Sequence, residues 1–188
     1  MGSGDAPNMT IFVCLGTIAE LIKLAPVVLA LRERDAEVVG IATGQNDLST
    51  SDFYDVVFPA GLQATVMPSP PRPTTLAFGW WAVVCLVRTP RVLRQIFRCR
   101  GTVRPVVIVH GDTVSTLIAA VASWGVGAEV VHIEAGLRSF RLLRPFPEEI
   151  CRIGVSRLAT WAFCPKTSAV ENLPKSRIRH VINTHENT

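Results

Sequence analysis

The chain has 188 residues, of which 48% are hydrophobic and 18% charged, and a net charge of +4. It is too apolar and too weakly charged to be intrinsically disordered, and its length suits one domain with a substantial core. Its 13 glycines and 13 prolines follow no repeat, which excludes a collagen-like chain. A charge this small does not indicate a nucleic-acid partner, and we expect none.

Five cysteines are present, none at C-x-x-C spacing, and their number is odd. This pattern argues against a disulfide framework or a zinc site and favours free thiols in a reducing, cytoplasmic setting. Residues 1–9 are polar and lack the basic and apolar regions of a signal peptide, so we expect a disordered N-terminus. Met1 and Met9 both stay open as the true start.

Short apolar runs alternate with longer helical patterns in the first half of the chain. Thr10–Leu15 and Glu37–Ala42 have the length and composition of strands. Between them, apolar residues at helical spacing predict a helix over Glu20–Arg34. Residues 44–75 are rich in Gly, Asn, Asp, Ser and Pro and predict loops, with one short strand over Asp55–Phe58.

The second half continues this alternation. Strands are predicted at Pro105–His110, Ala128–Ile133, Trp161–Cys164 and Arg179–Ile182, and helices at Thr89–Arg100, Val114–Trp124, Pro147–Leu158 and Ser168–Leu173. The strands are apolar throughout, which is typical of strands buried on both faces. With helices between them, they predict an α/β domain with a doubly wound, Rossmann-like parallel sheet over residues 10–182, followed by a tail over 183–188.

The longest uncharged apolar run is Thr74–Val87. At 14 residues it is shorter than the roughly 20 residues of a membrane span, and a buried helix or loop–helix segment is the favoured interpretation. Contact with a membrane interface remains the alternative, because Trp80 and Trp81 are followed by Arg88. A basic helix face follows, predicted to be solvated or to meet an acidic membrane or partner; it consists of Arg88, Arg91, Arg94 and Arg98.

Polar residues follow four of the predicted strands, where ligands bind in parallel α/β sheets. They are Gly16-Thr17, Gly44-Gln45, His110–Thr113 and Glu134–Arg138. Gly16 and Thr17 open a helix, whose amides could hold a phosphate or form an ordinary strand–helix turn. The chain has neither G-x-G-x-x-G nor a P-loop pattern, which argues against a dinucleotide cofactor.

Three acidic residues, Asp112, Glu134 and Glu148, are expected to meet at this rim. Asp112 could instead cap a helix, and Glu148 with Glu149 could simply favour a helix dipole. Glu134 follows a buried strand, where a carboxylate is costly unless it is paired or functional. His132 alternates with it and is predicted to be a core histidine. Crowded carboxylates raise one another's pKa, which would create a general acid beside a general base.

Cationic residues near the rim could balance this charge or bind an anionic ligand. Lys23 lies on the first predicted helix and could contact a phosphate. Arg138, Arg141 and Arg144 precede Glu148 in the chain and could clamp an anion.

Five segments together resemble the non-hydrolysing UDP-N-acetylglucosamine 2-epimerases. They are Gly16–Pro26, Thr43–Gln45, His110–Thr113, His132–Ser139 and Pro145–Arg152, in matching order and spacing. The combination of HGDT, H-x-EAGLRS and PFPEE is specific, whereas each motif alone is weak. The resemblance runs through most of the chain, but residues 48–104 match poorly.

The resemblance implies that this chain is equivalent to the N-terminal half of a GT-B-type fold. It also implies reversible inversion at C2 of UDP-N-acetylglucosamine, by elimination and re-addition of UDP, with no cofactor or metal, in cell-envelope polysaccharide biosynthesis. Carried over by motif, Asp112, Glu134 and Glu148 would be the acid–base carboxylates. The substrate-binding residues would be Gly16, Thr17, Lys23, Gln45, His110 and Arg138.

Three departures from the family pattern bear on activity. Ile18 stands where the family usually has an arginine, expected near the diphosphate or the catalytic carboxylates, and Cys151 stands where it has an asparagine. The chain stops near the end of the family's first domain, so we expect a truncated epimerase without the second domain. Two alternatives remain: a non-catalytic sugar-nucleotide-binding remnant, or a half-enzyme completed by a partner chain that supplies the second domain. A homodimer is a further possible assembly.

Overall fold

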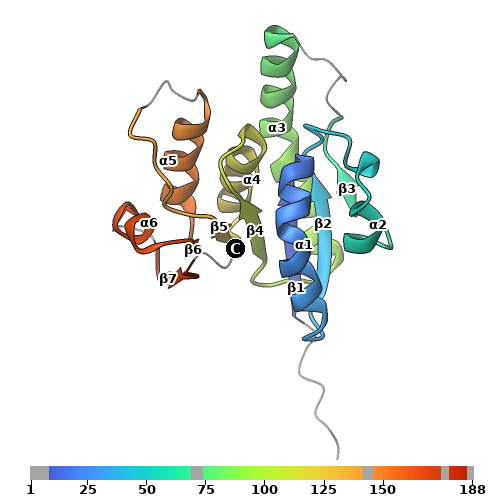
Figure 1. Ribbon diagram of the computed structural model, residues 1–188. Helices are drawn as coiled ribbons and strands as arrows, with labels where there is room; N and C mark the ends of the chain where they lie inside the picture. The colour runs from blue at the N-terminus through green and yellow to red at the C-terminus, as the bar shows by residue number, and fades with distance from the viewer. Residues whose placement is uncertain (1–8, 69–73, 142–145, 175–177, 186–188) are drawn as a thin grey trace, which may run out of the picture.

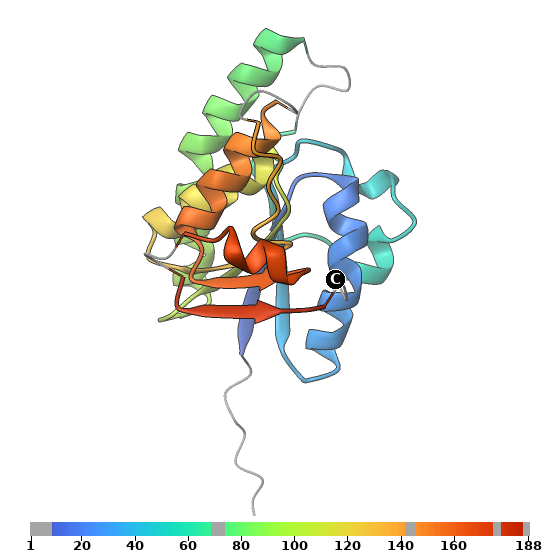
Figure 2. The same ribbon diagram turned by 60° about the vertical axis from the view of Figure 1, so that its left-hand side comes forward.

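The chain forms a seven-stranded parallel sheet with helices on both faces (Figures 1 and 2). The computed structural model describes residues 9–68, 74–141, 146–174 and 178–185. The predicted disorder of residues 1–8, the proposed role of Arg144 and the end of the predicted tail lie outside these ranges.

The strands run in the order β3-β2-β1-β4-β5-β6-β7, and every neighbouring pair is parallel. They are β1 (Thr10–Leu15), β2 (Glu37–Ala42), β3 (Ala64–Thr65), β4 (Val106–His110), β5 (Glu129–Ile133), β6 (Trp161–Cys164) and β7 (His180–Asn183). The order reverses between β1 and β4, and ligands bind at such a switch point in open α/β sheets. The predicted Rossmann-like fold class is confirmed.

Six α-helices and one short 3-10 helix connect the strands within the described residues. They are α1 (Ile18–Arg32), η1 (Leu48–Thr50), α2 (Tyr54–Val57), α3 (Thr75–Cys99), α4 (Val114–Gly125), α5 (Glu148–Leu158) and α6 (Thr167–Glu171).

Two apolar layers cover the sheet, one on each face. Alternate residues of β1 point to opposite faces, so that Phe12 packs with α3, α4 and α5, whereas Val13 packs with α1 and α2. β4 divides in the same way, with Val107 on the first face and Ile108 on the second. Because both faces are covered, the strands need apolar residues at every position, as the sequence pattern indicated.

The predicted strand over Asp55–Phe58 is wrong, because this segment contains the helix α2. Val57 is buried while Val56 is exposed, so the β-branched pair does not form a two-sided buried strand. A run of four residues is too short for apolar periodicity to separate helix from strand.

The helix α3 begins 14 residues before the predicted Thr89, because Thr74 caps it by accepting a hydrogen bond from the Ala77 amide. The predicted burial of Thr74–Val87 is also wrong, since only Trp81 and Cys85 are buried there. Within the described ranges, α3 is the one helix long and apolar enough to cross a membrane, and 22% of its apolar window is buried.

Candidate active site at the carboxyl edge of the sheet

The loops after β4 and β5 are fastened to each other at the edge of the sheet. The Gly111 amide donates to the Ile133 carbonyl at 3.0 Å. His132 Nε2 lies 2.8 Å from the Gly111 carbonyl oxygen, so the ring donates to the same loop. The predicted burial of His132 in the core is confirmed, although its Nδ1 has no partner among the described residues. These contacts fix the positions of Asp112 and Glu134.

Glu134 joins two residues that were predicted to bind substrate. Its carboxylate accepts two hydrogen bonds from Lys23 Nζ of α1, at 2.7 and 2.8 Å, and lies 3.5 Å from His110 Nε2. The backbone of Glu134 has a φ of +61°, a left-handed conformation that is unfavourable for a residue with a Cβ atom. Such strain persists where surrounding contacts determine it and is frequent at functional sites.

Asp112 and Glu148 share a cation that the sequence analysis overlooked. Arg152 Nη2 contacts Asp112 Oδ2 and lies 3.8 Å from Glu148 Oε2. Arg152 follows Glu148 by one helical turn in α5, and this i,i+4 spacing is the sequence signal that could have identified it.

Two buried residues connect these contacts into one cluster. Burial lowers the pKa of His110; the charges of Glu134 and Asp112 act against this shift, and that of Lys23 reinforces it. Burial also raises the pKa of the Cys151 thiol to about 11, and the charges of Asp112 and Glu148 add to that effect. The predicted carboxylates therefore form two neighbouring groups, Glu134 with Lys23 and His110, and Asp112 and Glu148 with Arg152, so that each has a cation beside it.

Glu149 has a structural environment that sequence reasoning missed. Its side chain is completely buried and accepts hydrogen bonds from Arg138 Nε, from the Ser139 amide at 2.9 Å and from Ser139 Oγ at 3.1 Å. Burial opposes its ionisation, but these donors outweigh burial and lower the pKa of Glu149. Arg138, predicted to contact substrate, is thus bound to a carboxylate of its own chain.

Glu20 fills the predicted phosphate position at the start of α1. Its carboxylate accepts the amides of Gly16 at 2.6 Å and Thr17 at 3.1 Å, and Thr17 caps the helix in return. Thr113 and Thr116 of the β4–α4 region donate their hydroxyl groups to the other carboxylate oxygen. Burial raises the pKa of Glu20 although these hydrogen bonds favour the ionised form. The T-x-x-E capping pattern of Thr17 and Glu20 could have revealed this contact.

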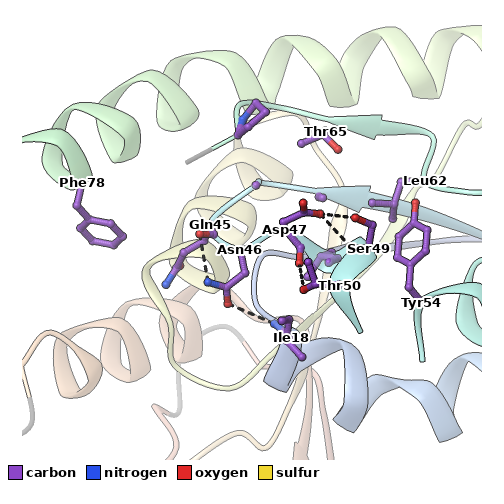
Figure 3. Close-up of a pocket in the computed structure, with 14 residues that line it drawn as sticks. Ile18, Gln45, Asn46, Asp47, Ser49, Thr50, Tyr54, Leu62, Thr65 and Phe78 are labelled. Carbon is purple, nitrogen blue, oxygen red and sulfur yellow. Dashed lines mark hydrogen bonds between the residues drawn. The ribbon is translucent and has the colours of Figure 1, made fainter. Parts of the chain in front are cut away.

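A pocket of about 900 Å³ adjoins the start of α1 (Figure 3). Gln45 lies on its wall, and its side-chain oxygen accepts a hydrogen bond from Ser115 at 2.7 Å. Ile18 occupies the wall where the family resemblance leads us to expect an arginine. The described lining contains no cationic side chain and one acidic residue, Asp47, so it offers a diphosphate hydrogen bonds but no positive charge.

Metal ligation finds no support in the described ranges, where no group of three or more His, Cys, Asp or Glu side chains could hold an ion. The side chains at the carboxyl edge can instead donate and accept protons.

The strand order and the helical layers define this chain as a Rossmann-like α/β domain of the type that forms the N-terminal half of GT-B enzymes. The chain belongs to the UDP-N-acetylglucosamine 2-epimerase family, whose model matches residues 85–184.

Relatives support this assignment along most of the chain. A UDP-N-acetylglucosamine 2-epimerase of Methanocaldococcus jannaschii is 32% identical over 171 residues, which are 90% of this chain and 43% of the relative. The solved UDP-GlcNAc 2-epimerase of Neisseria meningitidis bound to UDP-GlcNAc matches with a TM-score of 0.72 and 27% identity, over 94% of this chain and 46% of that one.

A third relative is more similar over a shorter stretch. The UDP-2,3-diacetamido-2,3-dideoxy-D-glucuronate 2-epimerase of Pseudomonas aeruginosa is 46% identical over 67 residues, which are 36% of this chain. The chain spans less than half the length of all these relatives.

Proposed function

We propose that this chain provides one wall of a UDP-N-acetylglucosamine 2-epimerase active site. The observation that carries the proposal is the cluster formed by Asp112, Glu134 and Glu148, with their cationic partners Lys23 and Arg152. These three carboxylates belong to the motifs that resemble the family, and they come from three different elements of the carboxyl edge.

The proposed chemistry needs acid–base groups on more than one side of the sugar. In the forward direction a carboxylate removes the C2 proton, the C–H electron pair forms the C1–C2 double bond, and the C1–O bond breaks to release UDP. Re-addition of UDP to C1 returns a proton to C2 from the opposite face. Glu134 follows β5, Asp112 lies in the loop after β4 and Glu148 begins α5, and we propose that these carboxylates act on more than one side of the sugar.

The departing diphosphate needs positive charge, and three cationic side chains near this site are already paired within the chain. Lys23, Arg152 and Arg138 are each paired with a carboxylate, and Ile18 adds no charge. We therefore propose that a second domain, from a longer form of the protein or from a partner chain, completes the UDP site. This fits the relatives, of which the chain spans less than half.

A diacetamido uronate is a second candidate substrate. The observation that favours it is the 46% identity with the Pseudomonas aeruginosa relative over 67 residues. Both candidates are UDP-linked 2-acetamido sugars, so the same C2 inversion applies. Parallel assays of UDP-N-acetylglucosamine and UDP-2,3-diacetamido-2,3-dideoxy-D-glucuronate separate them.

We also propose a reducing, cytoplasmic setting. All five cysteines are free thiols, and four of them are buried. Thiols persist in this form where the compartment keeps them reduced.

The test follows C2 of UDP-N-acetylglucosamine by NMR in D2O. The purified chain is assayed alone and after mixing with the C-terminal half of the Methanocaldococcus jannaschii relative. We expect deuterium at C2 in the mixture, and an equal rate for Glu33→Gln, a control at an exposed acid far from the site. A folded chain that gives no exchange in either sample would contradict the proposed function, and calorimetric binding of the UDP-sugar without exchange would support the sugar-nucleotide-binding remnant instead.

A further inference from the structure

One face of α3 carries large apolar side chains that the domain does not cover. Leu76, Trp80, Val83 and Val87 are 87%, 66%, 55% and 51% exposed. Their spacing of four, three and four residues places them on one helical stripe. The opposite face holds the buried residues of the helix, including Trp81 and Cys85. Figures 1 and 2 show this N-terminal half of α3 extending beyond the other elements.

The exposed stripe continues along the helix as a row of arginines. Arg91, Arg94 and Arg98 follow Val87 at helical spacing on the exposed side, and Arg88 lies beside them. No ion pair involves any of these four guanidinium groups within the described part of the chain.

The charge of this region is unusually one-sided. Residues 56–111 contain seven arginines and no acidic residue, whereas the whole chain has a net charge of +4. The rest of the chain therefore has a net charge of −3, since the seven arginines exceed the total of +4 by three. The basic excess is concentrated in the part of the chain that contains α3.

We propose that α3 docks this protein on the surface of an anionic lipid bilayer. The apolar stripe would enter the interfacial layer over about 16 Å of helix, and the arginines would lie along lipid phosphates over the next 15 Å or so. Tryptophan and arginine are well suited to this boundary, because each combines an apolar body with a polar or charged end.

Two other arrangements fit the observations less well. A second copy of α3 brings no acidic side chain of its own to the four arginines, because residues 75–99 contain none. A transmembrane orientation would expose Leu93, Ile96 and Phe97, which are buried in the core of the domain. Surface docking leaves this core intact.

Docking would also bring the pocket near the membrane. Phe78, two residues from both Leu76 and Trp80, lines the same pocket as Gln45 (Figure 3). The inference rests on α3 alone and does not depend on the proposed epimerase activity.

The test measures flotation of the whole chain with vesicles of phosphatidylcholine alone and with an equal mixture of phosphatidylcholine and phosphatidylglycerol. We expect binding to the anionic vesicles, loss of binding at high salt, and little binding to the neutral ones. Two variants of α3 test the two halves of the stripe: Leu76→Ser with Trp80→Ser, and Arg91→Gln with Arg94→Gln. Each should reduce the fraction bound about tenfold.

The matched control removes the same charge from exposed arginines elsewhere, by Arg157→Gln with Arg179→Gln, and should retain binding. Circular dichroism checks that each variant is folded. The proposal is overturned if the wild-type chain fails to float, or if the control loses as much binding as the α3 variant. Self-association that disappears in Leu76→Ser with Trp80→Ser, without vesicle binding, would assign the face to a second copy and also overturn it.

Discussion

Two sets of carboxylates lie at the same edge of the sheet, and the protein surrounds them differently. Glu20 and Glu149 are buried, and each accepts hydrogen bonds from main-chain amides as well as side chains. The side chains of Asp112, Glu134 and Glu148 are 26%, 18% and 45% exposed. Their partners are the side-chain nitrogens of lysine, histidine and arginine.

This difference separates a structural role from the chemical role that we propose. A buried carboxylate is tolerated only when donors satisfy it, so its oxygens are committed to the fold. A partly exposed carboxylate whose partner is a lysine or arginine side chain can exchange that partner for a substrate. The edge therefore contains acids that are committed to the fold beside the acids that we propose for proton transfer.

The largest effect is expected for Glu149→Ala. The substitution leaves the Arg138 guanidinium and the Ser139 amide without their acceptor, and we expect a loss of about 4 kcal/mol in the free energy of unfolding. The neighbouring exposed Glu148→Ala should cost under about 1 kcal/mol. Chemical denaturation measures both, and equal losses would remove the distinction between the two sets.

The pH dependence of stability tests the histidine that supports the Asp112 loop. Burial lowers the pKa of His132 to about 4, from an ordinary value of 6.5. A lowered histidine pKa means that the neutral ring stabilises the fold above pH 6.5, and that this contribution falls by about 3 kcal/mol as the pH decreases towards 4. His132→Gln should lessen this decline, and His185→Gln, at an exposed histidine, should leave it unchanged. An unaltered decline in His132→Gln would contradict the account.

Glu20→Ala should have an intermediate effect. It removes the acceptor of the Gly16 and Thr17 amides just before α1 and of the hydroxyl groups of Thr113 and Thr116, and we expect a loss of about 2 kcal/mol. Glu33→Ala, at the exposed end of the same helix, is the control for helix propensity. Thermal and chemical unfolding of the two variants should differ clearly; matching values would mean that Glu20 does not hold the loops.

The smallest effect on stability is expected for Glu148→Gln. Its carboxylate is half exposed and has one long contact with Arg152, so the free energy of unfolding should change by less than about 0.5 kcal/mol. A larger loss in chemical denaturation would place Glu148 with the structural acids.

The sheet could be predicted well because its strands have clear boundaries in sequence. The limits of β1, β2 and β6 coincide with the predicted ones, since each is a buried apolar run between polar turns. The start of α3 could not be predicted in the same way. Its first turns expose Leu76 and Trp80, so they lack the amphipathic pattern of a helix that packs on the domain along its whole length.

The candidate site was only partly readable from sequence. Family motifs pointed to Asp112, Glu134 and Glu148, but which acids are buried depends on contacts between distant segments. Glu20 contacts Thr113 and Thr116, which lie more than 90 positions away in the chain. No local sequence pattern predicts a contact between such distant segments. Helical spacing could have identified the contact of Arg152 with Glu148. Its contact with Asp112 depends on where the fold places the loop after β4, which helical spacing does not predict.

The most direct test of the division between structural and acid–base carboxylates measures the rate of deuterium exchange at C2 of UDP-N-acetylglucosamine. The chain is mixed for this assay with the C-terminal half of its Methanocaldococcus jannaschii relative. We predict that Glu134→Gln reduces the exchange rate at least about a hundredfold while the protein stays folded, because an amide cannot take the C2 proton or return it. Exchange at the wild-type rate in folded Glu134→Gln would contradict the assignment of acid–base chemistry to this edge.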